Sequence, residues 1–273
     1  MSIVARDFPA DVPDLQALVS QSREGDLVWL TIERPEVMNC LSFPTLRRLR
    51  TLCENLREDL SVRAILITGA GDKAFCAGAD LKERKTMAPE RVPEFVRNIR
   101  RTMDDVAALP QPTIAVVNGF AFGGGTELLL ACDLRVAAAH AQFGLTETTL
   151  AIVPGAGGTQ RLPRLVGKSR AKDLILTGRK IDAVEAERIG LVNRVAPEGK
   201  LRETALALAA QIAENGPVAV RAAKSAIDEG CEKRLPQGLE VEARCYERVL
   251  ATKDRLEALA AFAEKRKPRY TGL

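Results

Sequence analysis

Asn118-Gly119-Phe120-Ala121-Phe122-Gly123-Gly124-Gly125-Thr126-Glu127 is the stretch that decides the fold of this protein. It follows an apolar run at 113–117, which predicts a buried strand, and leads into apolar residues 128–132, which predict a buried helix. Three consecutive glycines let the backbone approach a ligand closely. The first N–H groups of a helix are unpaired and carry partial positive charge, so this turn is suited to bind a developing oxyanion. Glu127 lies just under one helical turn after Gly124, which predicts a carboxylate beside these donors.

The composition indicates one sizeable globular core, alone or with an appendage. The 273 residues are 46% hydrophobic and 28% charged, which argues against a disordered or coiled-coil chain. The net charge is only +4 and the basic residues are spread out except near the C-terminus, so nucleic-acid or membrane binding is not expected. No apolar run reaches the roughly 20 residues that span a bilayer. The N-terminal residues lack the pattern of a transit peptide or secretory segment, so we expect a cytoplasmic protein.

Cysteine and histidine usage excludes several kinds of chemistry. Six cysteines are scattered without a CxxC pair, so we expect reduced core residues and no metal site. Any Ser-His or Cys-His mechanism would need the only histidine, His140, and the sequence has no G-x-S-x-G motif. We therefore expect His140 to be a polar loop residue. Nucleotide-binding folds are not predicted either, because neither G-x-x-x-x-G-K-[ST] nor a strand followed by G-x-G-x-x-G occurs.

The order of the expected elements divides the chain into three parts. Residues 1–24 are predicted to be a poorly ordered tail. Residues 25–199 alternate short apolar strands with amphipathic helices, which predicts a mixed α/β core. Residues 200–273 show helical periodicity alone and predict an α-helical C-terminal region. Strands are expected at 26–33, 64–68, 113–117, 133–137 and 191–195, and helices at 45–60, 92–109, 168–177, 182–189, 200–214, 217–229, 236–250 and 253–264.

Two other glycine-containing connections accompany the first. Residues 73–83 place small residues around Gly78 between a strand and a helix, which suits either close approach of a ligand or a tight packing turn. Residues 154–162 form a second glycine-rich loop. The 73–83 connection therefore joins the first glycine turn as a second place where a ligand could approach the backbone.

Five segments together resemble the crotonase, or enoyl-CoA hydratase, superfamily. In the family's order they are FCAGADLKE at 75–83, NGFAFGGGTEL at 118–128, Cys132-Asp133, FGLTE at 143–147 and VPGAGGTQRL at 153–162. The resemblance covers nearly everything after residue 25. It implies an α/β fold built as a spiral of ββα units, with a C-terminal helical region that packs homotrimers, commonly paired into homohexamers. It also implies an acyl-CoA thioester substrate without a metal or a separate cofactor, since CoA is part of the substrate.

The resemblance assigns four residues to catalysis. The backbone N–H groups of Ala77 and Gly124 match the oxyanion hole for the thioester carbonyl, and both positions are small and close to glycine. Glu127 and Glu147 match the two glutamates of the hydratases. Hydration places oxygen on C3 and a proton on C2, so Glu127 would hold and activate water and protonated Glu147 would deliver the proton. Outside the motif, these glutamates would be a helix first-turn residue and a capping or surface residue.

A CoA site is implied by the loop at 34–41 (RPEVMNCL), which resembles the family's adenine-side segment. Glu36 stands where relatives often have lysine, which argues against a phosphate contact at this position. Positive charge could come instead from Lys82 or from the C-terminal Lys265, Arg266 and Lys267 of a neighbouring subunit, although a solvated C-terminus explains these residues equally well. The implied CoA-binding residues are Glu36, Val37, Met38, Cys40, Cys76, Ala79, Asp80, Leu81, Lys82, Lys265 and Lys267.

The expected activity is syn addition of water to a 2-enoyl-CoA in fatty-acid or branched-chain amino-acid degradation. Several segments look closest to the branch that contains methylglutaconyl-CoA hydratases that also bind AU-rich RNA. Lysines along one helix accompany RNA binding there, whereas this chain has Phe43, Arg47 and Thr51 at that spacing, so RNA binding is not expected. Superfamily isomerases usually lack one of the two glutamates, so a hydratase is favoured over an isomerase. A methylglutaconyl-CoA hydratase, an isomerase, and an RNA-binding or non-catalytic protein stay as alternatives.

Overall fold

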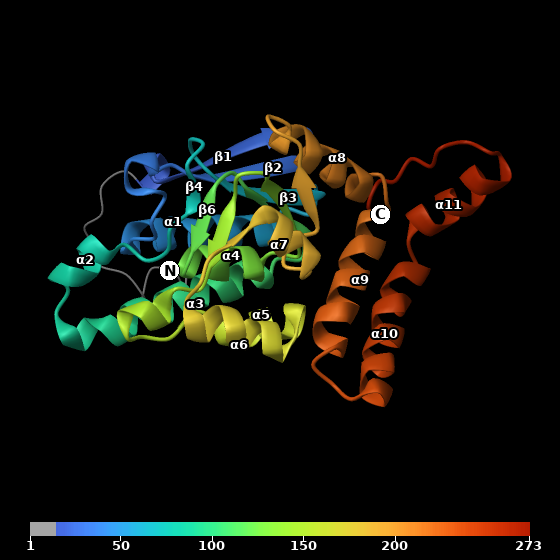
Figure 1. The fold of residues 1–273 in the computed structure, drawn as a ribbon. Coiled ribbons are helices and arrows are strands. Elements are labelled where there is room, and N and C mark those ends of the chain that lie inside the picture. The colour runs from blue at the N-terminus through green and yellow to red at the C-terminus, as the bar shows by residue number, and fades with distance from the viewer. Residues whose placement is uncertain (1–14) are drawn as a thin grey trace.

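The computed structural model describes residues 15–273 and places two sheets among surrounding helices (Figure 1). The strands of the larger sheet are, in spatial order, β1 (Val19–Glu24), β2 (Leu27–Ile32), β3 (Ala64–Gly69), β5 (Thr113–Val117), β7 (Leu134–Ala138) and β10 (Arg194–Ala196). Those of the smaller sheet are β4 (Ala74–Cys76), β6 (Phe120–Phe122), β8 (Gln142–Gly144) and β9 (Ile181–Asp182). Neighbouring strands are parallel except for the pairs β1–β2 and β8–β9.

Helices cover both sheets and form the whole C-terminal part of the chain. The α-helices are α1 (Phe43–Glu58), α2 (Leu81–Thr86), α3 (Val92–Ala107), α4 (Gly124–Ala131), α5 (Gly158–Val166), α6 (Lys168–Thr177), α7 (Ala183–Arg188), α8 (Leu201–Ala213), α9 (Pro217–Gly230), α10 (Leu235–Leu250) and α11 (Lys253–Ala263). Short 3-10 helices are η2 (Leu15–Ala17), η3 (Pro35–Val37), η4 (Pro89–Arg91) and η5 (Glu147–Leu150).

Repetition of one unit generates the two sheets. The pairs β3–β4, β5–β6 and β7–β8 each place their first strand in the larger sheet and their second in the smaller one, and helices follow each pair. Because β3, β5 and β7 are parallel neighbours, and β4, β6 and β8 likewise, each unit lies one strand farther along both sheets. The predicted spiral of ββα units is confirmed.

The larger sheet is buried on both faces, which explains its continuous apolar strands. Ile65 and Ile67 of β3 belong to the main core, which includes residues of α1, α3 and α4. Leu66 points to the opposite face and joins a second cluster with Ala205 and Leu208 of α8. Since successive strand residues alternate between faces, a run such as β3 needs apolar residues at every position.

The expected disordered tail is wrong for residues 15–24. β1 pairs with β2 along its whole length, from Val19 opposite Ile32 to Glu24 opposite Leu27, and Gly25 makes the turn with φ 62°. Apart from the buried Val19, this edge strand is polar, so it carries no hydrophobic pattern from which a strand could be predicted. The backbone hydrogen bonds to β2 hold it in the sheet. The part of the prediction that concerns residues 1–14 lies outside the described residues.

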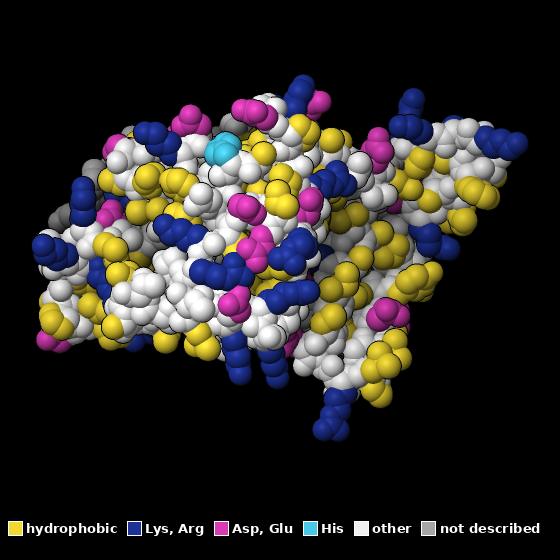
Figure 2. Space-filling model, viewed as in Figure 1, with side chains coloured by type: hydrophobic (Ala, Val, Ile, Leu, Met, Phe, Trp, Pro, Cys, Tyr) yellow, Lys and Arg dark blue, Asp and Glu magenta, His cyan; other side chains and the backbone are white. Residues whose placement is uncertain are grey.

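The C-terminal helices α9, α10 and α11 project from the sheets, and α9 and α10 lie side by side (Figure 1). α10 and α11 expose many large apolar side chains, and hydrophobic surface is visible over this part of the molecule (Figure 2). Phe262 is the most exposed of them, at 86%. Monomeric proteins rarely expose large contiguous apolar surfaces. No helix within residues 15–273 combines the length and the hydropathy of a membrane span.

Candidate active site

The glycine turn that opens α4 brings backbone N–H groups to the surface of a site. Gly123 precedes the helix with φ 51°, and Gly124 is the first helical residue. A Cβ on Gly125 would lie 1.8 Å from the carbonyl oxygen of Cys76, so only glycine allows the helix to pack this closely against β4. As expected for a first-turn residue, the N–H of Gly124 has no acceptor within the described part of the chain.

The loop after β4 packs directly against this turn. Gly78 has φ 101°, and a Cβ there would lie only 3.2 Å from the nitrogen of Gly124 and 2.8 Å from the carbonyl oxygen of Phe122. A Cβ on Gly124 would lie 3.7 Å from the nitrogen of Ala79. The backbone nitrogens of Ala79 and Gly124 are therefore neighbours across two glycines.

The assignment of Ala77 as an oxyanion donor needs correction. Its N–H donates to the carbonyl of Met38 at 3.0 Å and is not available to a substrate. The N–H of Ala79 has no acceptor among residues 15–273, although both neighbouring peptide groups are bonded to Leu41. Donors that stabilise an oxyanion must be unpaired before the substrate arrives and must converge on one point. Ala79 and Gly124 meet these conditions, and Ala77 does not.

Glu127 lies in the first turn of α4 with only 3% of its surface exposed. Its Oε1 accepts hydrogen bonds from the N–H groups of Ala156 at 2.7 Å and Gly158 at 2.8 Å. Burial raises the pKa of this carboxyl, while the two hydrogen bonds favour the charged form and oppose the rise. Both N–H groups bond Oε1, so neither restrains Oε2. The arrangement holds a carboxylate rigidly and suits it to orient a water molecule.

Glu147 begins η5, just after β8, and reaches the same glycine turn. A Cβ on Gly123 would lie 3.1 Å from its Oε1, and its Oε2 is buried without a hydrogen-bond partner in the described chain. Burial, and then the nearby charge of Glu127, raises the pKa of Glu147 to about 7. A carboxyl with this pKa keeps a proton near neutrality and can give it to a reactant. The two glutamates thus have different environments that suit a base and an acid.

The second glycine-rich loop has a role that the sequence reasoning missed. Its N–H groups at Ala156 and Gly158 hold Glu127, and a Cβ on Gly158 would lie 3.1 Å from Glu127 Oε1. Glycines at 155, 157 and 158 were the available signal, because they indicate a close approach to the backbone. His140 makes no contact with this site: its Nε2 contacts the carbonyl oxygens of Asp72 and Asn118, as suits a polar loop residue.

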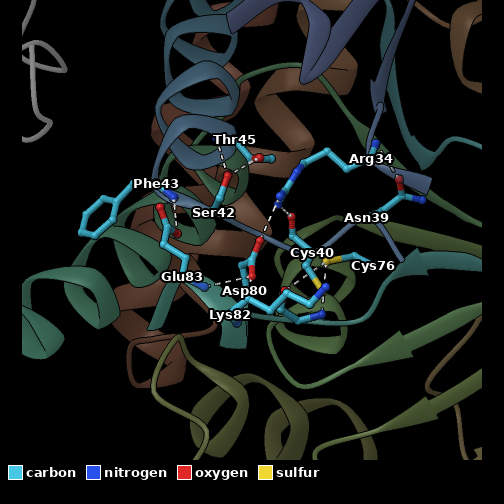
Figure 3. A network of polar contacts seen from close by, with 11 residues as sticks. Arg34, Asn39, Cys40, Ser42, Phe43, Thr45, Cys76, Asp80, Lys82 and Glu83 are labelled. Carbon is cyan, nitrogen blue, oxygen red and sulfur yellow. Dashed lines mark hydrogen bonds and ion pairs between the residues drawn. The ribbon is translucent and has the colours of Figure 1, made fainter. Parts of the chain in front are cut away.

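The implied CoA-binding residues form two groups. Those at 36–40 and 76–82 lie in two neighbouring loops, whereas Lys265 and Lys267 lie far from both (Figure 1). Val37 and Met38 lie in or just after η3, and Glu36 is exposed. The carbonyl of Met38 accepts from the N–H of Ala77, and Cys40 lies near Cys76 and Asp80 (Figure 3). Leu81 and Lys82 are exposed in the first turn of α2.

Two implied CoA-binding side chains are used inside the protein. The thiol of Cys76 is fully buried, and burial raises its pKa to about 12, so it presents no charge to a ligand. The carboxyl of Asp80 is held by Arg34 at 2.9 Å and also caps α2 (Figure 3). Arg34 was not among the predicted site residues, because its role depends on a partner 46 residues away. These two side chains therefore support the loop rather than face CoA.

Lys265 and Lys267 are not brought to the site by their own chain. They follow α11, which lies at the opposite end of the molecule from α1 and α2 (Figure 1). Lys267 contacts Glu214 at 3.5 Å, and both side chains are largely exposed. Within residues 15–273 no group of three or more His, Cys, Asp or Glu side chains is arranged to hold a metal ion.

Comparison with known proteins places this geometry in a family. The enoyl-CoA hydratase/isomerase model matches residues 22–272. The Arabidopsis thaliana protein named probable enoyl-CoA hydratase 2, mitochondrial, is 51% identical over 249 residues, which are 91% of this chain and 83% of that protein. Mouse mitochondrial methylglutaconyl-CoA hydratase is 49% identical over 250 residues, 90% of this chain and 80% of that one. The crystal structure of an enoyl-CoA hydratase from Bacillus anthracis, 53% identical, covers 94% of this chain and 100% of its own with a TM-score of 0.92. This chain belongs to the enoyl-CoA hydratase/isomerase family of the crotonase superfamily.

Proposed function

We propose that this protein is an enoyl-CoA hydratase that adds water across the 2,3 double bond of a 2-enoyl-CoA thioester. The observation that carries the proposal is the placement of two dissimilar carboxyls, Glu127 and Glu147, at the Gly123 turn beside two unpaired N–H groups. A single carboxyl at this turn would suffice for moving a proton between carbon atoms. Two carboxyls allow one group to activate water while the other delivers a proton.

The reaction begins when the thioester oxygen accepts hydrogen bonds from Ala79 and Gly124. These donors stabilise the enolate oxygen that develops as the nucleophile adds, and one such donor is typically worth about 3 kcal/mol of barrier. Glu127 holds the water and accepts one of its protons as the oxygen bonds to C3. Glu147 gives its proton to C2. Proton exchange that reprotonates Glu147 and returns Glu127 to the carboxylate then restores the site.

The acyl group and the pathway are proposed more broadly, as fatty-acid or branched-chain amino-acid degradation. Similarity to mouse methylglutaconyl-CoA hydratase makes a 3-methyl-branched enoyl-CoA the first specific candidate. The proposal needs no separate cofactor, because CoA is part of the substrate, and a cytoplasmic location stays a prediction from the sequence. The test is a hydration assay with crotonyl-CoA and with short, long and 3-methyl-branched enoyl-CoAs. Loss of the absorbance of the conjugated thioester measures the reaction. No turnover across this panel would refute the hydratase proposal.

We also propose that the protein assembles as a homotrimer or as a homohexamer made from two trimers. The apolar side chains that α10 and α11 expose, including Leu256, Leu259 and Phe262, support a buried role for these helices in an assembly. A neighbouring subunit could then bring Lys265 and Lys267 to a CoA site. Sedimentation equilibrium of the full chain tests this, and a monomer at micromolar concentration would contradict it.

A further inference from the structure

Asp80, the residue that follows Ala79, forms an ion pair with Arg34 that is mostly shielded from solvent. Arg34 Nη2 lies 2.9 Å from Asp80 Oδ2, and the two side chains are only 15% and 11% exposed. Arg34 Nη1 also donates to the carbonyl oxygen of Cys40 at 2.6 Å. One guanidinium therefore joins two loops, 38–41 and 77–80, that come from different parts of the sequence (Figure 3).

The two carboxylate oxygens of Asp80 have different partners: Oδ2 bonds Arg34, and Oδ1 bonds the start of α2. Its Oδ1 accepts hydrogen bonds from the N–H groups of Lys82 at 3.1 Å and Glu83 at 3.2 Å, which caps α2. Its own N–H donates to the carbonyl of Leu41 at 2.9 Å. The residue after Ala79 is thus fixed through its side chain and its backbone.

The peptide groups on both sides of Ala79 are tied to the same residue. Leu41 N donates to the Gly78 carbonyl at 2.8 Å, and the Leu41 carbonyl accepts from Asp80 N. Leu41 directly follows Cys40, which Arg34 holds. The orientation of the Ala79 N–H consequently depends on a closed set of contacts that passes through Arg34, Asp80 and Leu41.

We propose that the Arg34–Asp80 ion pair is a positioning device that aims the Ala79 N–H at the thioester oxygen. The inference rests on the proposed hydratase function and adds two residues that do not touch the reacting atoms. If the pair is broken, the Leu41–Gly78 and Leu41–Asp80 contacts can shift, and the Ala79 donor moves relative to that of Gly124. A displacement of about 1 Å in a catalytic group can cost roughly 100-fold in rate.

The test uses Asp80→Asn, because asparagine keeps an oxygen for the α2 cap but turns an amide N–H₂ toward the guanidinium. We expect kcat for crotonyl-CoA to fall roughly 10- to 100-fold, with KM changed less than about threefold, because the donor bonds the enolate oxygen of the transition state more strongly than the ground-state carbonyl. Arg34→Gln, which leaves the α2 cap intact, should act in the same direction and provides the measurement if Asp80→Asn does not fold.

A second ion pair in the chain gives a matched control. Arg50 Nε lies 2.7 Å from Asp105 Oδ2, with side-chain exposures of 6% and 30%, and joins α1 to α3. Arg50→Met should lower the melting temperature without a comparable fall in kcat. If Asp80→Asn and Arg50→Met affect stability and kcat in the same proportion, Arg34 and Asp80 have only a structural role and the proposal is wrong.

A spectroscopic measurement separates this inference from the proposed reaction. Butyryl-CoA labelled with ¹³C at the thioester carbonyl cannot be hydrated, and donors at its oxygen lower the C=O stretching frequency. The wild type and Arg50→Met should show the same downshift on binding, and Asp80→Asn a smaller one. An equal downshift in all three would overturn the positioning role, as would its absence in the wild type. A downshift that depends on Asp80, together with no hydration of any enoyl-CoA, would refute the reaction and retain the positioning role.

Discussion

The N–H of Gly158 donates to Oε1 of Glu127 at 2.8 Å and joins the first residue of α5 to the first turn of α4. The N–H of Ala156 bonds the same oxygen at 2.7 Å. Two charge-assisted hydrogen bonds to one oxygen orient the carboxyl and favour its ionised form although it is buried. The base of the proposed reaction is therefore set by a loop 31 residues away in the sequence.

Replacement of the proposed base should remove most activity. Glu127→Gln keeps the shape of the side chain but cannot accept a proton from water, and we expect kcat to fall about 10²- to 10⁴-fold. The exposed Glu198 supplies a control, since Glu198→Gln should keep normal kinetics. Steady-state rates with crotonyl-CoA measure the effect. A normal rate in folded Glu127→Gln would remove its catalytic assignment.

The rate should fall above neutrality because the proposed acid must carry a proton. Burial and the charge of Glu127 raise the pKa of Glu147 to about 7, so its protonated fraction declines as pH rises through this value. We expect kcat/KM to decline on the alkaline side of about pH 7. The residual activity of Glu147→Gln should lack this alkaline limb, that is, the decline of kcat/KM above about pH 7. Persistence of the limb in that variant would assign it to another group.

Glu147 should also make the protein less stable at high pH. The carboxyl titrates near 7 in the folded protein and near its ordinary 4.5 when unfolded, so its stabilising contribution is present below pH 4.5 and is lost as pH rises through 7. Glu147→Gln avoids the cost of a buried charge and should gain up to about 3 kcal/mol at pH 8, with much less gain at pH 5. Urea unfolding at both pH values measures this. An equal gain at both would show that ionisation is not the cause.

Crowding of Gly158 should uncouple the second loop from Glu127. A Cβ there would lie 2.9 Å from Leu145 Cδ1 and 3.1 Å from Glu127 Oε1, closer than side chains normally pack. We expect Gly158→Ala to cost roughly 1–3 kcal/mol of stability and at least about tenfold in kcat. Gly230→Ala is the control, because its Cβ would meet nothing closer than 3.6 Å. Wild-type kcat in Gly158→Ala would show that the loop can relax without disturbing the base.

The sequence by itself determined the elements with a strong local period and the two glutamates. α6 was predicted with its observed bounds, and α8 to α11 within one residue at each end, because an amphipathic face recurs every few residues along the chain. The motifs likewise carry Glu127 and Glu147 as residue identities. These features depend on residues that are close together in the sequence, so they can be recognised without knowing the tertiary contacts.

Only the tertiary structure decided which groups are paired and which are free. The strands of the smaller sheet are two or three residues long, too short to show a period, and β10 lies at 194–196 rather than 191–195. The choice of Ala79 over Ala77 depends on the Met38 carbonyl, and the Arg34–Asp80 pair joins residues 46 apart. A hydrogen bond uses a donor only once it meets an acceptor, and distant segments supply that acceptor after folding. The sequence therefore indicated the chemistry of the site, and folding selected the N–H groups that can perform it.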